Sequence, residues 1–173
     1  VLRAAVAPGP DDLFITGDPH QRIYDSRVSL GALGISVAGR SSRLRINYRS
    51  TEEILSWSTG VLVGSRVEDL GGEGEDNLTG YRSLLHGLAP DVRHFDTAEA
   101  ELNFIIAALK DLTTAVPGES ICLVARTTRL LTGHYLPALS AAGLPVCLLT
   151  ADTPDAGTPG VRLATLHRVK GLE

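Results

Sequence analysis

Short apolar runs alternate with helix-forming stretches along this chain, and that alternation restricts its fold more than any other feature. Residues 121–125 form a continuous apolar run between Ser120 and Arg126, which is typical of a strand covered on both faces. Further strands are predicted at 146–149 and 161–165. Strands and helices in strict alternation predict an α/β fold, in which a parallel sheet carries helices on both faces.

Capping residues mark where the predicted helices begin. Ser50 and Glu53 have the spacing of a capping box, in which a hydroxyl and a carboxylate each accept a backbone amide of the first turn. Asp96 and Glu99 repeat this spacing before a second helix, and Thr127 precedes a third. These signals predict three helices that connect the strands.

The charge balance narrows the partners that the chain can bind. Its 173 residues carry a net charge of -4, so any binding to nucleic acid depends on local cations and not on long-range attraction. One local group contains four arginines without an acid among them: Arg40, Arg43, Arg45 and Arg49. No apolar stretch approaches the roughly 20 residues of a membrane span, so we expect no membrane partner.

The two cysteines, Cys122 and Cys147, lie in apolar runs and lack the C-x-x-C spacing of a metal or redox site. The five histidines are scattered. We therefore expect reduced cysteines, no metal site within this chain, and a cytoplasmic setting.

A first polar cluster follows a strand predicted at 13–16. It reads Gly17-Asp18-Pro19-His20-Gln21-Arg22-Ile23-Tyr24. A glutamine carboxamide at the end of a strand can donate to a terminal phosphate oxygen and accept from an attacking water, so Gln21 is a candidate phosphate sensor. The alternative is a turn in which Asp18 binds its own backbone and Pro19 sets the bend, and this cluster alone does not separate the two.

A second cluster, Asn47-Tyr48-Arg49-Ser50, joins a strand predicted at 44–47 to the amino terminus of a helix. The planar guanidinium of Arg49 can bridge two phosphate oxygens, and the amides of the first helical turn add partial positive charge. The alternative is that Arg49 pairs with Glu52 or Glu53 on the surface while Tyr48 is half-buried packing.

A third cluster follows the strand predicted at 161–165 and reads Thr165-x-His167-x-x-Lys170-Gly171-x-Glu173. Thr165 and His167 can donate hydrogen bonds to the phosphates of a nucleic-acid strand. Gly171 allows close approach of the backbone, and Glu173 can accept from ribose hydroxyls. Of the three clusters this one is the most specific, because four polar residue types and a glycine occur at fixed spacing.

Taken in order, the three clusters resemble motifs III, IV and V of the UvrD/Rep-type superfamily 1 DNA helicases. The resemblance implies a RecA-like fold of the P-loop NTPase type, ATP with Mg²⁺ as cofactor, and single-stranded DNA as partner. It assigns the γ-phosphate to Gln21 and Arg49, adenine stacking to Tyr48, and further nucleotide contacts to Gly171 and Glu173. To the nucleic-acid strand it assigns Tyr24, Arg27, Thr165 and His167.

The resemblance covers nearly the whole chain and implies two parts. Residues 1–38 correspond to the C-terminal end of a first RecA-like domain with its linker, and residues 39–173 to most of a second, truncated at motif V. The chain has no Gly-x-x-x-x-Gly-Lys-Ser/Thr loop and no Asp-Glu pair for magnesium. We therefore expect a fragment that is inactive alone and that works with the remainder of the first RecA-like domain.

Two departures from the family pattern keep a second function open. Ser26 stands where the family has an aromatic residue, which removes one base-stacking contact. Only a short loop at 150–160 stands where UvrD and Rep carry a large inserted subdomain. The alternative is a nucleotide-driven remodelling factor, for example one acting on RNA polymerase, that does not unwind duplex DNA.

Overall fold

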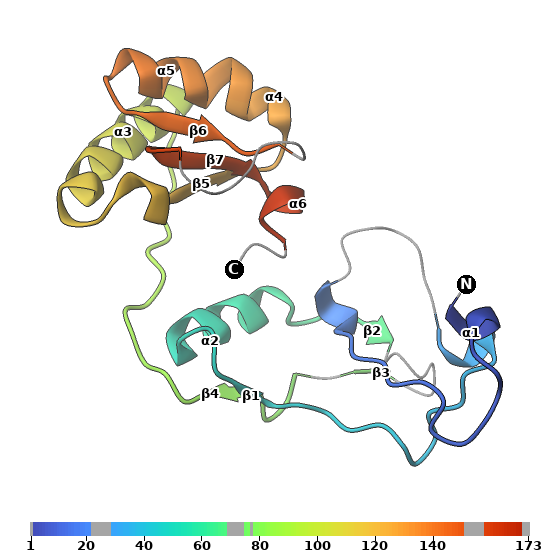
Figure 1. Cartoon of the computed structure of the whole chain (residues 1–173). Coiled ribbons are helices and arrows are strands. Elements are labelled where there is room, and N and C mark those ends of the chain that lie inside the picture. The colour runs from blue at the N-terminus through green and yellow to red at the C-terminus, as the bar shows by residue number, and fades with distance from the viewer. Residues whose placement is uncertain (1, 22–28, 69–74, 77, 151–157, 171–173) are drawn as a thin grey trace. The chain divides into compact units, whose positions relative to one another are not determined.

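The computed structural model describes residues 2–21, 29–68, 75–76, 78–150 and 158–170. The chain separates into two compact units, Val1–Val92 and Arg93–Glu173 (Figure 1). The domain boundary predicted at residue 38 falls inside the first unit. The division into two helicase domains stays a prediction.

A three-stranded parallel sheet forms the centre of the unit Arg93–Glu173. Strands β5 (Cys122–Ala125) and β6 (Val146–Leu148) both pair with β7 (Val161–Thr165), which lies between them. The three predicted strands are thus confirmed to within one residue. The first four residues of β7 are all buried, as expected for a strand with a partner on each edge.

One helix precedes β5, and a run of helical segments connects β5 to β6. They are α3 (Ala98–Ala115), α4 (Thr128–Leu130), a π-helical turn (Leu131–Tyr135) and α5 (Leu136–Ala141). The predicted cap at Thr127 is confirmed, because its side-chain oxygen accepts the Leu130 amide at 3.3 Å.

The amino-terminal cap of α3 differs from the prediction by one residue. Thr97, and not Asp96, accepts the Ala100 amide at 3.1 Å through its hydroxyl. Thr97 has the extended backbone that a cap requires, with φ of -137° and ψ of 150°. The helix therefore begins at Ala98.

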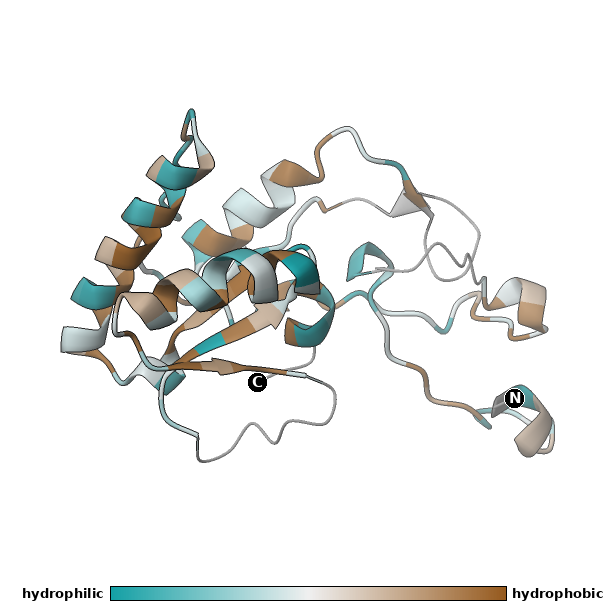
Figure 2. Cartoon of the chain, turned by 90° about the horizontal axis from the view of Figure 1, so that it is seen from above, coloured by the Kyte–Doolittle hydropathy of each residue, from teal (hydrophilic) through white to brown (hydrophobic). Residues whose placement is uncertain are grey.

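The main helices pack against one and the same face of the sheet. Val161 and Leu163 point to that face, since side chains alternate along a strand, and both are 0% exposed. They share a buried cluster with Leu109 of α3 and Leu139 of α5. Figure 2 shows the strands of this sheet mostly in brown, the colour of hydrophobic residues.

The opposite face has a smaller apolar cluster. Cys147, Leu149 and Ala164 pack there with Val169 of α6 (Leu166–Val169). The α/β class and the parallel sheet are confirmed, and helical segments contact both faces, although unequally. Within the described part of this unit, α3 and α5 lie on one face, and the other is contacted by the four-residue α6.

The unit Val1–Val92 is made of short elements. They are α1 (Leu2–Ala5), two 3₁₀ turns (Pro19–Gln21 and Gly31–Leu33), β1 (Ile46–Asn47), α2 (Glu52–Val61), β2 (Val67–Glu68), β3 (Glu75–Asp76) and β4 (Arg82–Ser83). Strand β1 pairs in parallel with β4, and β2 pairs antiparallel with β3.

Two strands predicted for this unit are corrected by the structure. Residues 13–16 form no strand, and the Phe14 side chain is 93% exposed. Of the strand predicted at 44–47, only Ile46 and Asn47 pair with a neighbour. An apolar run becomes a strand only where a second strand supplies its hydrogen bonds, so local propensity was overridden here.

Candidate functional site

A cavity of about 340 Å³ lies at the carboxyl ends of β6 and β7, beside the start of α4. Parallel α/β sheets bind ligands at this edge, because the polar residues that follow each strand gather there. The cavity is lined by Thr128, Leu131, Leu148, Leu149, Thr150, Thr165, His167 and Arg168. The structure thus brings the predicted pair Thr165 and His167 together at one site.

Thr165 ends β7 and caps α6. Its hydroxyl oxygen accepts the Arg168 amide at 3.2 Å, which uses a lone pair and leaves the hydroxyl hydrogen able to donate to a ligand. His167 follows in α6 and is exposed. The third cluster therefore begins with a short helix, and it presents two hydrogen-bonding side chains to the cavity.

Four basic residues follow strand ends at this edge of the sheet, and none of them was among the predicted site residues. Arg126 directly follows β5, and Arg129 lies in α4. Arg168 lies in α6, and its Nε donates to the Thr150 carbonyl at 2.9 Å. Lys170 follows α6. The position of basic residues immediately after predicted strands was a signal that could have identified them.

The helical wall of the cavity contains the π-helical turn. Leu131, the first residue of the turn, lines the cavity and is 1% exposed. Tyr135, its last residue, donates to Glu101 Oε1 at 3.4 Å. Burial, followed by the nearby Glu101 carboxylate, raises the pKa of Tyr135. This wall is therefore anchored in the core through Leu131 and tied to α3 through Tyr135.

The Tyr48–Arg49 turn lies in the other unit. Asn47 Oδ1 accepts the amides of Arg49 at 2.7 Å and of Ser50 at 2.9 Å, which bends the chain sharply after β1. Tyr48 is 70% exposed, so the alternative that it is half-buried packing is wrong. Arg49 is exposed as well.

The predicted capping box at Ser50 and Glu53 is replaced by a simpler cap. Thr51 precedes α2 in extended conformation, and its hydroxyl accepts from the Ile54 amide at 3.5 Å. The Glu53 carboxylate accepts the Gly87 amide at 2.8 Å. Glu53 is therefore engaged by a segment distant in sequence, and the cap shifts one residue towards the helix.

Gln21 lies in a 3₁₀ turn and not at the end of a strand. Its Nε2 donates to Asp18 Oδ2 at 2.8 Å, and Asp18 Oδ1 accepts the His20 amide at 2.9 Å. This is the turn that formed the alternative reading of the cluster, with Asp18 binding nearby backbone. The role of Gln21 as a phosphate sensor stays a prediction.

Four predicted site residues lie outside the described residues: Tyr24, Arg27, Gly171 and Glu173. Of the described ones, Gln21, Tyr48 and Arg49 belong to the unit Val1–Val92, and Thr165 and His167 to the unit Arg93–Glu173. The cavity in the second unit is thus the best-defined candidate site.

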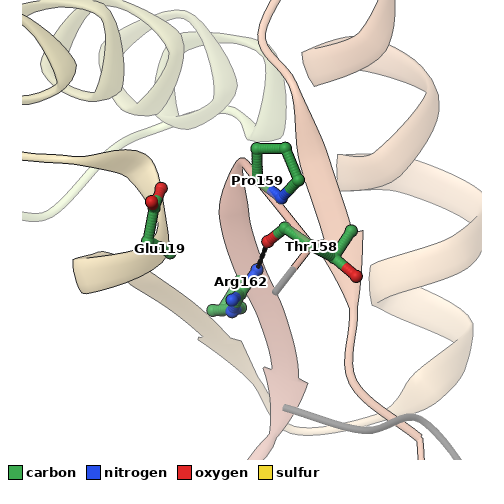
Figure 3. A pocket seen from close by; sticks show the side chains of 4 residues that line it. All are labelled: Glu119, Thr158, Pro159 and Arg162. Atoms are coloured by element: carbon green, nitrogen blue, oxygen red, sulfur yellow. Dashed lines mark hydrogen bonds between the residues drawn. The ribbon is translucent and has the colours of Figure 1, made fainter. Parts of the chain in front are cut away.

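A second cavity, of about 200 Å³, lies beside the start of β7 (Figure 3). It is lined by Glu119, Thr158, Pro159 and Arg162. Arg162 is 7% exposed, and its Nη1 donates to the carbonyl oxygens of Thr158 and Gly160. In register it stands between Cys122 of β5 and Cys147 of β6.

The turn before β7 requires glycine at position 160. Gly160 has a φ of 113°, and a Cβ built there would lie 2.6 Å from the Pro145 carbonyl. That carbonyl accepts the Val161 amide at 2.9 Å, so the close approach aligns β7 with β6. Arg162 binds the carbonyl oxygens of this turn, and we therefore assign it a structural role.

Comparison with protein-family models, with curated proteins and with solved structures finds no match to this chain. Within the described ranges, no group of three or more His, Cys, Asp and Glu side chains is arranged to hold a metal ion. None of the helices in the described part of the chain combines the length and apolarity needed to cross a membrane.

Proposed function

We propose that this chain is part of an ATP-dependent DNA helicase of the UvrD/Rep type, and that its unit Arg93–Glu173 binds the backbone of a single DNA strand. One observation carries the proposal. Thr165 and His167 line a cavity at the carboxyl edge of a parallel sheet, where Arg126, Arg129 and Arg168 also lie after strand ends.

The chemistry of this edge suits phosphodiester groups. Hydroxyl, imidazole and guanidinium groups all donate hydrogen bonds to phosphate oxygens, and such contacts carry no sequence information. Because the chain has a net charge of -4, these local cations provide the attraction that the whole molecule lacks. Binding is therefore independent of base sequence and sensitive to salt.

We assign the ATP contacts to Tyr48, Arg49 and Gln21, in the roles that the family resemblance implies. Tyr48 and Arg49 are adjacent and both exposed, so the phenol ring can stack on a base while the guanidinium binds a phosphate. The phosphate loop and the magnesium carboxylates are supplied by the remainder of the first RecA-like domain, in a cytoplasmic protein. ATP turnover then drives the second domain along the strand, and the chain alone does not hydrolyse ATP.

Fluorescence anisotropy of the full chain with a labelled thymidine homopolymer tests the DNA-binding part. We expect binding whose logarithm falls with the logarithm of salt concentration, with a slope of about -0.7 for each phosphate contact. Replacing Thr165 and His167 together by Ala should weaken binding at least about tenfold, since a hydrogen bond to a charged group contributes about 1.5–3 kcal/mol.

A matched control replaces the same two residue types elsewhere in the unit. Thr114 in α3 and His94 before it are exposed and do not line the cavity, so Thr114→Ala with His94→Ala should bind like wild type. Equal DNA binding by both double variants would show that the DNA-binding site does not lie in this cavity. An unwinding assay on the full-length protein separates a helicase from the remodelling factor, which turns over ATP without opening a duplex.

A further inference from the structure

Ser83 binds both ends of the Tyr48–Arg49 turn, although it lies far away in sequence. It ends β4 and pairs in register with Asn47 of β1. Its hydroxyl donates to the Ser50 carbonyl at 2.6 Å and lies 3.2 Å from the Asn47 carbonyl. Among the residues of Val1–Val92 whose burial the structure describes, Ser83 is the only buried one, with 7% exposure.

The segment that begins at Ser83 also holds the first turn of α2. The Glu52 carboxylate accepts the Ser83 amide, and the Glu52 amide donates to the Leu85 carbonyl at 2.7 Å. The Ser83 hydroxyl in turn accepts the Leu85 amide at 3.0 Å. Turn, helix and β4 are thereby joined by one network of hydrogen bonds with Ser83 at its centre.

Glu53 extends this network. Its carboxylate accepts the Gly87 amide at 2.8 Å and contacts His86 Nδ1 at 3.1 Å. The carboxylates of Glu52 and Glu53 are thus both bonded to residues 83–87. These bonds fix the backbone on the carboxyl side of Arg49, as Asn47 does on its amino side.

We propose that Ser83 is a positioning residue for Arg49. If Arg49 contacts a terminal phosphate, as in the proposed function, its guanidinium must meet two oxygens at once, and a small error in the backbone defeats that geometry. Because the turn is held at both ends, the backbone of Arg49 is already in position before the ligand binds. Ser83 touches no ligand itself and acts only through the turn.

Amide exchange measured by NMR on the full chain tests the positioning role. In Ser83→Ala the amides of Arg49 and Ser50 should exchange about tenfold faster or more, because a buried hydroxyl with several hydrogen-bond partners is lost. Exchange in the later turns of α2 should stay unchanged, which distinguishes release of the turn from general unfolding. Ser58→Ala is the matched control, since the exposed Ser58 hydroxyl donates only within α2, to the Leu55 carbonyl.

A milder variant decides the matter if Ser83→Ala unfolds α2. Ser83→Cys keeps the size of the side chain and weakens its donor, so the same two amides should exchange faster with α2 intact. Unchanged exchange at Arg49 and Ser50 in a folded Ser83 variant would overturn the proposal.

ATP turnover by the full-length protein connects the turn to function. Ser83→Ala should lower kcat while KM changes little, because Arg49 acts mainly in the transition state. If Arg49→Ala leaves turnover unchanged, the proposed function fails, whereas the exchange result still decides whether Ser83 holds the turn.

Discussion

Replacing Leu163 by Ala should destabilise the unit Arg93–Glu173 by about 3–4 kcal/mol. Leu163 is 0% exposed in the central strand and stands in register between Leu123 and Leu148. The change removes about three carbon groups at roughly 0.8 kcal/mol each, or about 2.4 kcal/mol of burial. A cavity closed by α3 and α5 adds about 1 kcal/mol, since surrounding side chains relax only partly.

That loss is large for a unit of this size. Domains are stable by roughly 0.05–0.15 kcal/mol per residue, which gives about 4–12 kcal/mol for about 80 residues. Leu166→Ala is the matched control. Leu166 lies three residues along the same segment and is 60% exposed, so its replacement should cost about 1 kcal/mol or less and leave no closed cavity.

Urea unfolding followed by far-UV circular dichroism measures both variants. Fluorescence of the single tryptophan is unsuitable, because Trp57 belongs to the other unit. Equal losses for the two variants, or a loss below about 1 kcal/mol for Leu163→Ala, would refute the assignment of Leu163 to the closed core.

Three further predictions address the caps and the turn. Thr97→Ala should cost about 1 kcal/mol of unfolding free energy and Asp96→Ala less than about 0.5 kcal/mol; a larger loss for Asp96→Ala would return the cap to that residue. Hydrogen bonds from its own amide, then from the Gly87 amide, lower the pKa of Glu53 from 4.5 to about 2. The stability that Glu53 contributes is present above its ordinary pKa and is lost as the pH falls through the lowered value. In the folded protein the carboxylate gains its proton near pH 2, so the Gly87 amide resonance should shift with a midpoint at about that pH. Glu53→Gln should abolish that shift, and a shift that persists in the variant would assign it to another group. Arg49→Ala should lower kcat for ATP in the full-length protein by about 10³, and Arg49→Lys should restore little, since a point charge cannot bridge two oxygens; wild-type turnover would return Arg49 to a surface role.

Sequence patterns predicted the unit Arg93–Glu173 well because local signals and tertiary partners agree there. The apolar runs that became β5, β6 and β7 each have a parallel neighbour, and Thr127 has both a cap residue's chemistry and its backbone. The run at 13–16 carries a similar local signal but forms no strand, and Gln21 therefore does not follow a strand. A hydrogen-bonded partner decides between these outcomes, and a local pattern does not contain it.

By itself the sequence determined the α/β class, the parallel strands and the position of Thr165 and His167 at the end of a strand. Only the tertiary structure decided that the main helices share one face of the sheet, that Arg168 binds the Thr150 carbonyl, and that Ser83 holds the Tyr48–Arg49 turn. The physical reason is the range of the interactions. Caps and alternating side chains act within a few residues, whereas the bonds of Ser83 depend on the register between β1 and β4, which lie more than thirty residues apart.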